Sequence, residues 1–183
     1  DDLIAASGAK EGGLKWGTTF AGGADHVGIH NFAKACGKMP YTIVPFKGGG
    51  DIVTNLVSGN IDVALLNYAE GESQYSAGEF RPVVSLSEEP IEALGGVKTA
   101  RDAGVDAMAS TVRGFACLSG VPQDRIDVLE NGLVKAMKHG VYQGYLSSGG
   151  MPKSSVVGAE KWTAHIRRIY DESTTALTEL GML

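Results

Sequence analysis

The chain of 183 residues is 43% hydrophobic and 20% charged, and 26 of its residues are glycine, as in a globular protein with many turns. The glycines follow no strict period, which excludes collagen, and no apolar run approaches the ~20 residues that cross a bilayer. The net charge of −5, with Arg167 and Arg168 as the only visible basic cluster, argues against binding to nucleic acid.

Strand and helix signals alternate along the first part of the chain. We expect a strand in LKWGTT, residues 14–19, followed at once by a helix over residues 24–36. A second strand, rich in β-branched and aromatic residues, is expected in YTIVPF at residues 41–46. After the loop KGGG comes a helix with one apolar face that ends at Gly59. The run IDVALL, residues 61–66, predicts a third strand.

The alternation continues through the middle of the chain. A fourth strand is expected near residues 81–86, where Pro82 suggests a late start or a place near an edge. A short helix is expected over residues 97–104, and STVRGFACLS, residues 110–119, predicts a fifth strand. Strands that alternate with helices predict an α/β fold with a mostly parallel sheet flanked by helices.

The last third of the chain has only helical patterns. One helix is expected with Pro122 in its first turn, a second over residues 141–148, and a third over residues 159–180 with one apolar side. We therefore expect an α/β lobe over residues 1–120 and a C-terminal helical segment over residues 121–183.

The segment GTTFAGGADH joins the first expected strand directly to a helix. A helix N-terminus presents unpaired backbone N–H groups and the positive end of the helix dipole, and both favour an anion. Thr18 and Thr19 add hydroxyl donors, and the glycines let a ligand approach the backbone. A plain strand-to-helix turn fits the same pattern. The dinucleotide pattern G-x-G-x-x-G is absent.

The segment VPFKGGGD repeats this layout after the second strand, without the spacing of a Walker A motif for nucleoside triphosphates. Neighbouring parallel strands end at the same edge of a sheet, so the two helix starts should meet there. Asn67, just after the third strand, would contribute at that edge. This coincidence favours an anion-binding site over two unrelated turns.

Other kinds of site have weaker signals. His26 and His30 are spaced as in some zinc sites, but the glutamate of H-E-x-x-H and a third ligand are missing, so we expect His26 to pack near the helix start. The sequence has neither a G-x-S-x-G motif nor a Cys beside a His, so it gives no support to nucleophilic catalysis. We expect Cys36 and Cys117 to be buried, inert thiols, and a disulfide between them has no support from spacing.

Taken in order, these segments resemble one family, the extracytoplasmic solute-binding proteins of tripartite tricarboxylate transporters (Bug or TctC-like). The resemblance rests on LKWGTTFAGGADHVGIHNF, on YTIVPFKGGGDIVTNLVSGNIDVALLN, and on AGEFRPVVSLS, VKTARDAGVD and RGFACLSGVPQDRIDVL with the closing helix. It covers essentially the whole chain, and the ordered set is more specific than any one motif.

The resemblance implies a lobe like that of a periplasmic binding protein, which captures a small carboxylate or dicarboxylate without any cofactor or chemistry of its own. It implies a periplasmic location and membrane transporter subunits as partners. Because the sequence starts with DDLIAASGAK, without Met or a signal-peptide core, any targeting segment should have been removed or lie outside it. The implied ligand-binding residues are Thr18, Thr19, Ala21, Gly22, Gly23, Ala24 and His26, with Lys47, Gly48 and Asn67 nearby.

Three departures from the family pattern affect this expectation. Phe20 stands where a small residue is usual, and Leu66 where an acidic residue is common. The family's N-terminal lobe has no counterpart in the sequence, so we expect weak or no binding by this chain alone, and self-association through the surface left by that lobe.

Two other functions stay open at this point. One is an α/β enzyme that uses the same anion site for a phosphorylated or carboxylated substrate, for which we find no poised base or nucleophile beyond His26. The other is a carboxylate sensor without a transport role, which the sequence does not separate from a transport receptor.

Overall fold

The computed structural model describes residues 2–183, and the chain divides into two compact units. The first unit contains the chain up to Thr111 together with Ser173–Leu183, and the second contains Val112–Glu172. In the described part of the chain no helix is both long and apolar enough to span a membrane.

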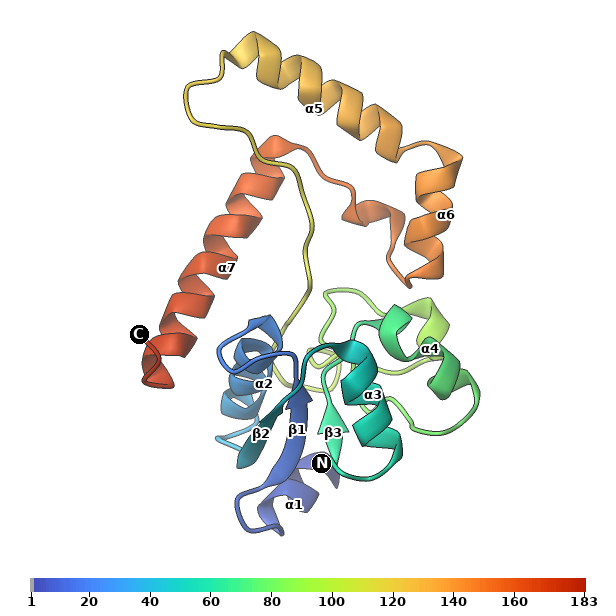
Figure 1. The fold of residues 1–183 in the computed structure, drawn as a ribbon, viewed down its shortest axis with the longest axis vertical. Coiled ribbons are helices and arrows are strands. Elements are labelled where there is room, and N and C mark those ends of the chain that lie inside the picture. Colours follow the sequence, from blue (N-terminus) through green and yellow to red (C-terminus); the bar gives the residue numbers. More distant parts are fainter. Residues whose placement is uncertain (1) are drawn as a thin grey trace. The chain divides into compact units, whose positions relative to one another are not determined.

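The first unit is built around a small parallel sheet. Its strands are β1 (Leu14–Thr18), β2 (Tyr41–Pro45) and β3 (Val63–Ala64), in the order β2-β1-β3. Figure 1 shows β1 between the other two strands, and all pairs run parallel. The expected parallel α/β arrangement is therefore confirmed, although the third strand is shorter than expected.

Helices cover both faces of this sheet. They are α1 (Asp2–Gly8), α2 (Ala24–Ala35), α3 (Gly49–Val57) and α4 (Tyr68–Ser76), with a 3-10 turn η1 (Glu92–Leu94). Neighbouring residues of a strand face opposite sides. Trp16 packs against Phe32 of α2, with ring centroids 6.2 Å apart, whereas a Cβ on Gly17 would meet Ile52 of α3 at 2.8 Å. The helices α2 and α3 consequently lie on opposite faces of β1.

The buried core of the first unit lies on the α2 side of the sheet. Ile29, Phe32 and Ala33 of α2 are at most 4% exposed and form one cluster with Trp16. The cluster is completed by residues that follow the sheet in sequence: Leu86, Ala100 and Ala107, with Met39 from the turn before β2. The α2 helix is thus held between the sheet and the later loops, which fixes where its N-terminus points.

Three expected elements are wrong, and two helices were not expected. Residues 81–86 form no strand, because Ser85 makes only an isolated parallel bridge with Thr99. Residues 97–104 form no helix, because residues 100–104 are turns and Gly95, Gly96 and Gly104 have positive φ. Residues 110–119 have no regular structure, since no described strand pairs with them. The sequence patterns did not predict α1 and α4.

The second unit is helical and has little core of its own. It contains α5 (Gln123–Met137), α6 (Gly140–Ser148), η2 (Lys153–Ser155) and most of α7 (Ala159–Glu179), whose end from Ser173 on belongs to the first unit. All three expected helices are present, and α6 and α7 match their expected bounds within one residue at each end. Pro122 stands just before α5 as its N-cap and not in its first turn. Leu146 is the only buried hydrophobic residue of this unit among those described.

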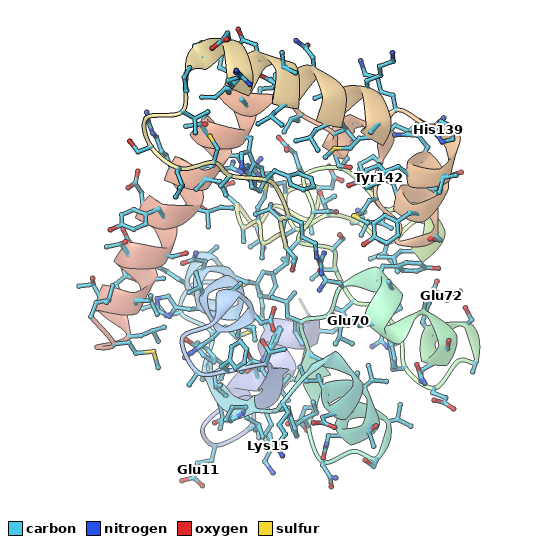
Figure 2. The ribbon with its side chains drawn as sticks, turned by 45° about the horizontal axis from the view of Figure 1, so that its top comes forward. Glu11, Lys15, Glu70, Glu72, His139 and Tyr142 are labelled. Carbon is cyan, nitrogen blue, oxygen red and sulfur yellow. The ribbon has the colours of Figure 1, made fainter. Side chains whose placement is uncertain are left out.

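A shallow apolar recess lies between α5 and α6. His139 and Tyr142, labelled in Figure 2, line it together with Val141 and Tyr145. Val141 is 79% exposed and Tyr145 is 54% exposed, so this recess is an open surface and not an enclosed cavity.

Candidate functional site

The carboxyl edge of the sheet gathers the segments that the sequence suggested for a site. Thr18 at the end of β1 pairs with Pro45 at the end of β2, and the Phe46 N–H donates to the Thr18 carbonyl at 2.8 Å. The loops that lead into α2 and α3 therefore leave the sheet side by side. Because the chain crosses from β2 past β1 to β3, this edge is also the switch point where α/β sheets bind ligands.

The loop before α2 is held in shape by its own hydrogen bonds. Asp25 Oδ2 accepts from the Thr19 hydroxyl at 2.9 Å and from the Thr19 N–H at 3.3 Å. Gly22 has a left-handed φ of 81°, and its N–H donates to His26 Nδ1 at 2.9 Å. The Gly23 N–H donates to the Phe20 carbonyl at 3.2 Å. These hydrogen bonds fix the geometry of the loop.

His26 supports this loop as a neutral side chain. It is 5% exposed, and burial lowers its pKa, with a smaller contribution from nearby His30. Because Nδ1 accepts the Gly22 N–H, the ring proton must lie on Nε2 in this neutral form. His26 therefore offers a ligand a hydrogen-bond donor at most, and not a positive charge.

Each of the two helices begins with three free backbone donors. The N–H groups of Ala24, Asp25 and His26 in α2 have no acceptor within residues 2–183. The same holds for the first three amides of α3, residues 49–51. Glycine precedes both helices as the N-cap, so no capping side chain covers these amides. The free donors and the two helix dipoles suit a carboxylate or another small anion.

Lys47 lies in the loop that leads into α3, immediately before the N-cap residue Gly48. Its side chain is exposed and forms no salt bridge with any residue that the structure describes. Gly48 next to it is in extended conformation, with open space where a Cβ would stand. A long cationic side chain is therefore available beside the start of α3.

Asn67 is already engaged by a residue that the sequence analysis missed. Glu70 Oε2 accepts from the Asn67 N–H at 2.8 Å and from its side-chain amide at 3.0 Å. This arrangement is part of a capping box at the start of α4. The spacing N-x-x-E before a helix is the signal that could have revealed it. Figure 2 labels Glu70 at the start of α4.

The C-terminal end of the chain lies against the α2 loop, which sequence reasoning also missed. A Cβ on Gly22 would be 3.3 Å from Met182 Sδ. Glu179 accepts from Lys34 Nζ at 2.5 Å and is 2.9 Å from His30 Nε2. The hydrogen bonds from Lys34 and then from His30 lower the pKa of the Glu179 carboxyl. The end of α7 thus supports the helix that carries the loop.

The histidines and cysteines that the sequence offered as candidates do not form a common site. His26 and His30 have different partners, and His30 Nδ1 is 3.0 Å from the Tyr41 hydroxyl. No three potential metal ligands among His, Cys, Asp and Glu come together in residues 2–183. Both cysteines are free, but the expectation that both are buried is wrong, because Cys117 is exposed and Cys36 half-buried.

Comparisons with known proteins agree with this fold. The family model described as the tripartite tricarboxylate transporter family receptor, TctC, matches residues 1–171. A TctC solute-binding protein from Polaromonas, solved without ligand, is similar with a TM-score of 0.80 and 22% identity over 97% of this chain and 60% of that chain.

Two further solved structures are similar. A protein of R. palustris solved with adipate has a TM-score of 0.73 and 20% identity over 98% of this chain and 60% of its own. A periplasmic transporter has a TM-score of 0.75 and 22% identity over 99% of this chain and 60% of its own. At these identities the likeness shows only that this chain has a fold of the periplasmic-binding-protein type. A comparison with curated proteins finds no match.

This chain therefore spans about 60% of the length of the solved proteins that it resembles. None of these likenesses supports the self-association expected from the sequence.

Proposed function

We propose that this chain, which belongs to the tripartite tricarboxylate transporter receptor (TctC) family, binds a small carboxylate at the carboxyl edge of its parallel sheet. The observation that carries the proposal is the pair of glycine-capped helix starts at that edge, whose first-turn amides have no acceptor within residues 2–183. Backbone N–H groups that converge at the ends of parallel strands favour anions over neutral ligands.

A carboxylate suits this edge better than a more highly charged anion. The donors are backbone amides and one exposed lysine, because the Thr18 and Thr19 hydroxyls already donate to the Phe20 carbonyl and to Asp25. No arginine is among the proposed residues. Helix starts can also bind phosphate, but arginine is the side chain favoured for bidentate phosphate recognition. One related structure was solved with adipate, a dicarboxylate, which supports this choice of ligand class.

The proposed role is capture without chemistry. The chain would hold its ligand in the periplasm and present it to membrane subunits of an uptake system. The proposed ligand-binding residues are Thr18, Thr19, Ala21, Gly22, Gly23, Ala24, His26, Lys47, Gly48 and Asn67. Thr18 is fully buried and Asn67 is bonded to Glu70, so we expect their role to be positioning of the loops.

The test is a titration of the ¹⁵N-labelled chain with adipate, followed by the backbone amide signals. We expect the signals of residues 24–26 to move, with an affinity in the millimolar range because the site is open to water. The variant Lys47→Gln should bind adipate about two- to fivefold more weakly, as for an exposed charge pair. Lys15→Gln is the matched control, since Lys15 lies near the opposite end of β1.

Amide signals at the carboxyl edge that stay unmoved by adipate, succinate and citrate up to high millimolar concentrations would contradict the proposal. Equal weakening by Lys47→Gln and Lys15→Gln would indicate a nonspecific effect of charge instead of a site at this edge.

A further inference from the structure

Glu70 places a carboxylate of the chain's own at the start of α3. Its Oε2 is fixed by two donors of Asn67, the backbone N–H and the side-chain amide. Its Oε1 accepts no hydrogen bond within the described residues. The carboxylate is therefore anchored through one oxygen and open at the other.

The open oxygen lies directly against Gly49, the first residue of α3. A Cβ on Gly49 would be 2.7 Å from Glu70 Oε1 and 2.8 Å from Glu70 Cδ, so a larger residue at this position would require the Glu70 carboxylate to move away. Every Cα–Cβ bond of an α-helix tilts toward the helix N-terminus. A group that meets the Cβ position of the first residue therefore lies beside the first turn of α3, close to its N-terminal end.

The two helix starts differ in the carboxylate that lies near each. At α2 the carboxylate comes from Asp25, in the helix itself, and its Oδ2 is turned toward Thr19 in the loop. At α3 the carboxylate comes from another helix and lies beside the first residue of α3. Asp51 in the first turn of α3 and Lys47 before it are the other charged groups at this end.

We propose that Glu70 is a specificity-determining residue that keeps a second ligand carboxylate away from α3 and accepts a hydrogen bond from the ligand instead. The inference rests on the proposed carboxylate binding and narrows its ligand class. Like charges at short range repel, so an anion at α3 must displace or neutralise Glu70. A hydroxyl or ammonium group can donate to the open Oε1. The ligand favoured by this edge is thus a hydroxy- or amino-carboxylate. Its hydroxyl or ammonium group lies at the opposite end of the molecule from its carboxylate.

The experiment compares two acids of equal length, adipate and 6-hydroxyhexanoate, by amide titration of the chain. The native chain should bind 6-hydroxyhexanoate at least as tightly as adipate. In Glu70→Gln the ratio of the two affinities should move about fivefold toward adipate, because the amide has no charge to repel the second carboxylate. Gln keeps the length of the side chain and an oxygen that can accept from Asn67, so the fold should be unchanged in the amide spectrum.

The matched control is Glu72→Gln, on the same helix two residues later and exposed, as labelled in Figure 2. It makes the same change in net charge but has no contact with Gly49, so it should leave the ratio unchanged. An unchanged ratio in Glu70→Gln, or an equal change in Glu72→Gln, would overturn the inference.

A second titration, with sulfate as the probe, separates this inference from the proposed function. The amides of residues 49–51 should respond to sulfate in Glu70→Gln and much less in the native chain. If neither organic acid binds either protein, the proposed function fails. The sulfate response then tests by itself whether Glu70 keeps anions away from the start of α3. Equal responses of these amides in both proteins, including no response in either, would overturn the inference.

Discussion

At the scale of single residues, the geometry of the loop before α2 depends on the charge of the His26 ring. Its Nδ1 holds the Gly22 N–H only while this nitrogen is unprotonated. Burial first, and His30 second, keep the pKa of His26 below the usual value of 6.5. Protonation would break the bond to Gly22 and place a charge in a buried position. The loop geometry consequently depends on a neutral imidazole.

This dependence predicts a pH effect on stability. Below pH 6.5 the unfolded chain binds a proton at His26 while the folded chain does not, so the free energy of unfolding should fall as the pH falls from 6.5 toward the lowered pKa of the folded state. The slope in this window is at most about 1.4 kcal/mol per pH unit. His26→Gln should remove this part of the slope, measured by urea unfolding between pH 5 and 8. A variant with the native pH dependence would contradict the role of His26.

Single residues also show what local sequence can predict about the site. The glycines and threonines before α2 lie where strand and helix patterns meet, so their place at the sheet edge followed from short-range signals alone. Glu70 reaches the site only because α4 packs beside α3 and a glycine stands opposite. Such a pairing depends on the tertiary fold, although the N-x-x-E spacing already indicated the cap.

At the scale of elements, the contact of β1 with α3 depends on the lack of a side chain at Gly17. A Cβ there would be 2.6 Å from Ile61 Cδ1 and 2.8 Å from Ile52 Cγ2, closer than carbon atoms pack. The strand can therefore approach α3 closely enough to seat Ile52, which is 1% exposed, against the sheet. This contact helps to fix the direction in which α3 points its N-terminus.

The variant Gly17→Ala should lower the free energy of unfolding by about 1–2 kcal/mol, because it overpacks this contact. Gly50→Ala is the matched control, since nothing lies within 4 Å of its Cβ position and alanine favours a helix. It should leave stability unchanged or raise it by about 0.5 kcal/mol. Unfolding is best followed by Trp16 fluorescence in a Trp162→Phe background, because these are the two tryptophans of the chain. Equal stability of Gly17→Ala and Gly50→Ala would contradict the packing argument.

Helices were predicted better than strands for a physical reason. The periodicity that reveals α2, α3, α5, α6 and α7 lies within each segment, so it can be read without the fold. A strand needs a partner, and β-propensity describes how a side chain fits a pleated surface more than what the backbone does alone. Residues 81–86 and 110–119 have the composition of strands but no neighbour that continues the sheet in the described residues. Their backbone is therefore irregular.

At the scale of the whole molecule, the chain leaves the first unit once and returns to it through α7. Between residues 110 and 121 no backbone N–H donates to a backbone carbonyl of the described chain, and this segment has no helix or strand. The return is different, because α7 is a continuous helix whose end is fixed to α2 through Glu179, Lys34 and His30. The two connections should therefore differ in their resistance to proteases.

Limited trypsin digestion should cut first after Arg113, the only lysine or arginine between residues 110 and 121 and an exposed one. The two fragments should separate on a denaturing gel but elute together in size exclusion, because Ser173–Leu183 packs within the first unit. Arg113→Gln should abolish this first cut, as mass spectrometry of the fragments can verify. A first cut after Arg167 or Arg168 would instead mean that α7 opens more readily than the 110–121 segment, and that the helical return does not hold the chain together.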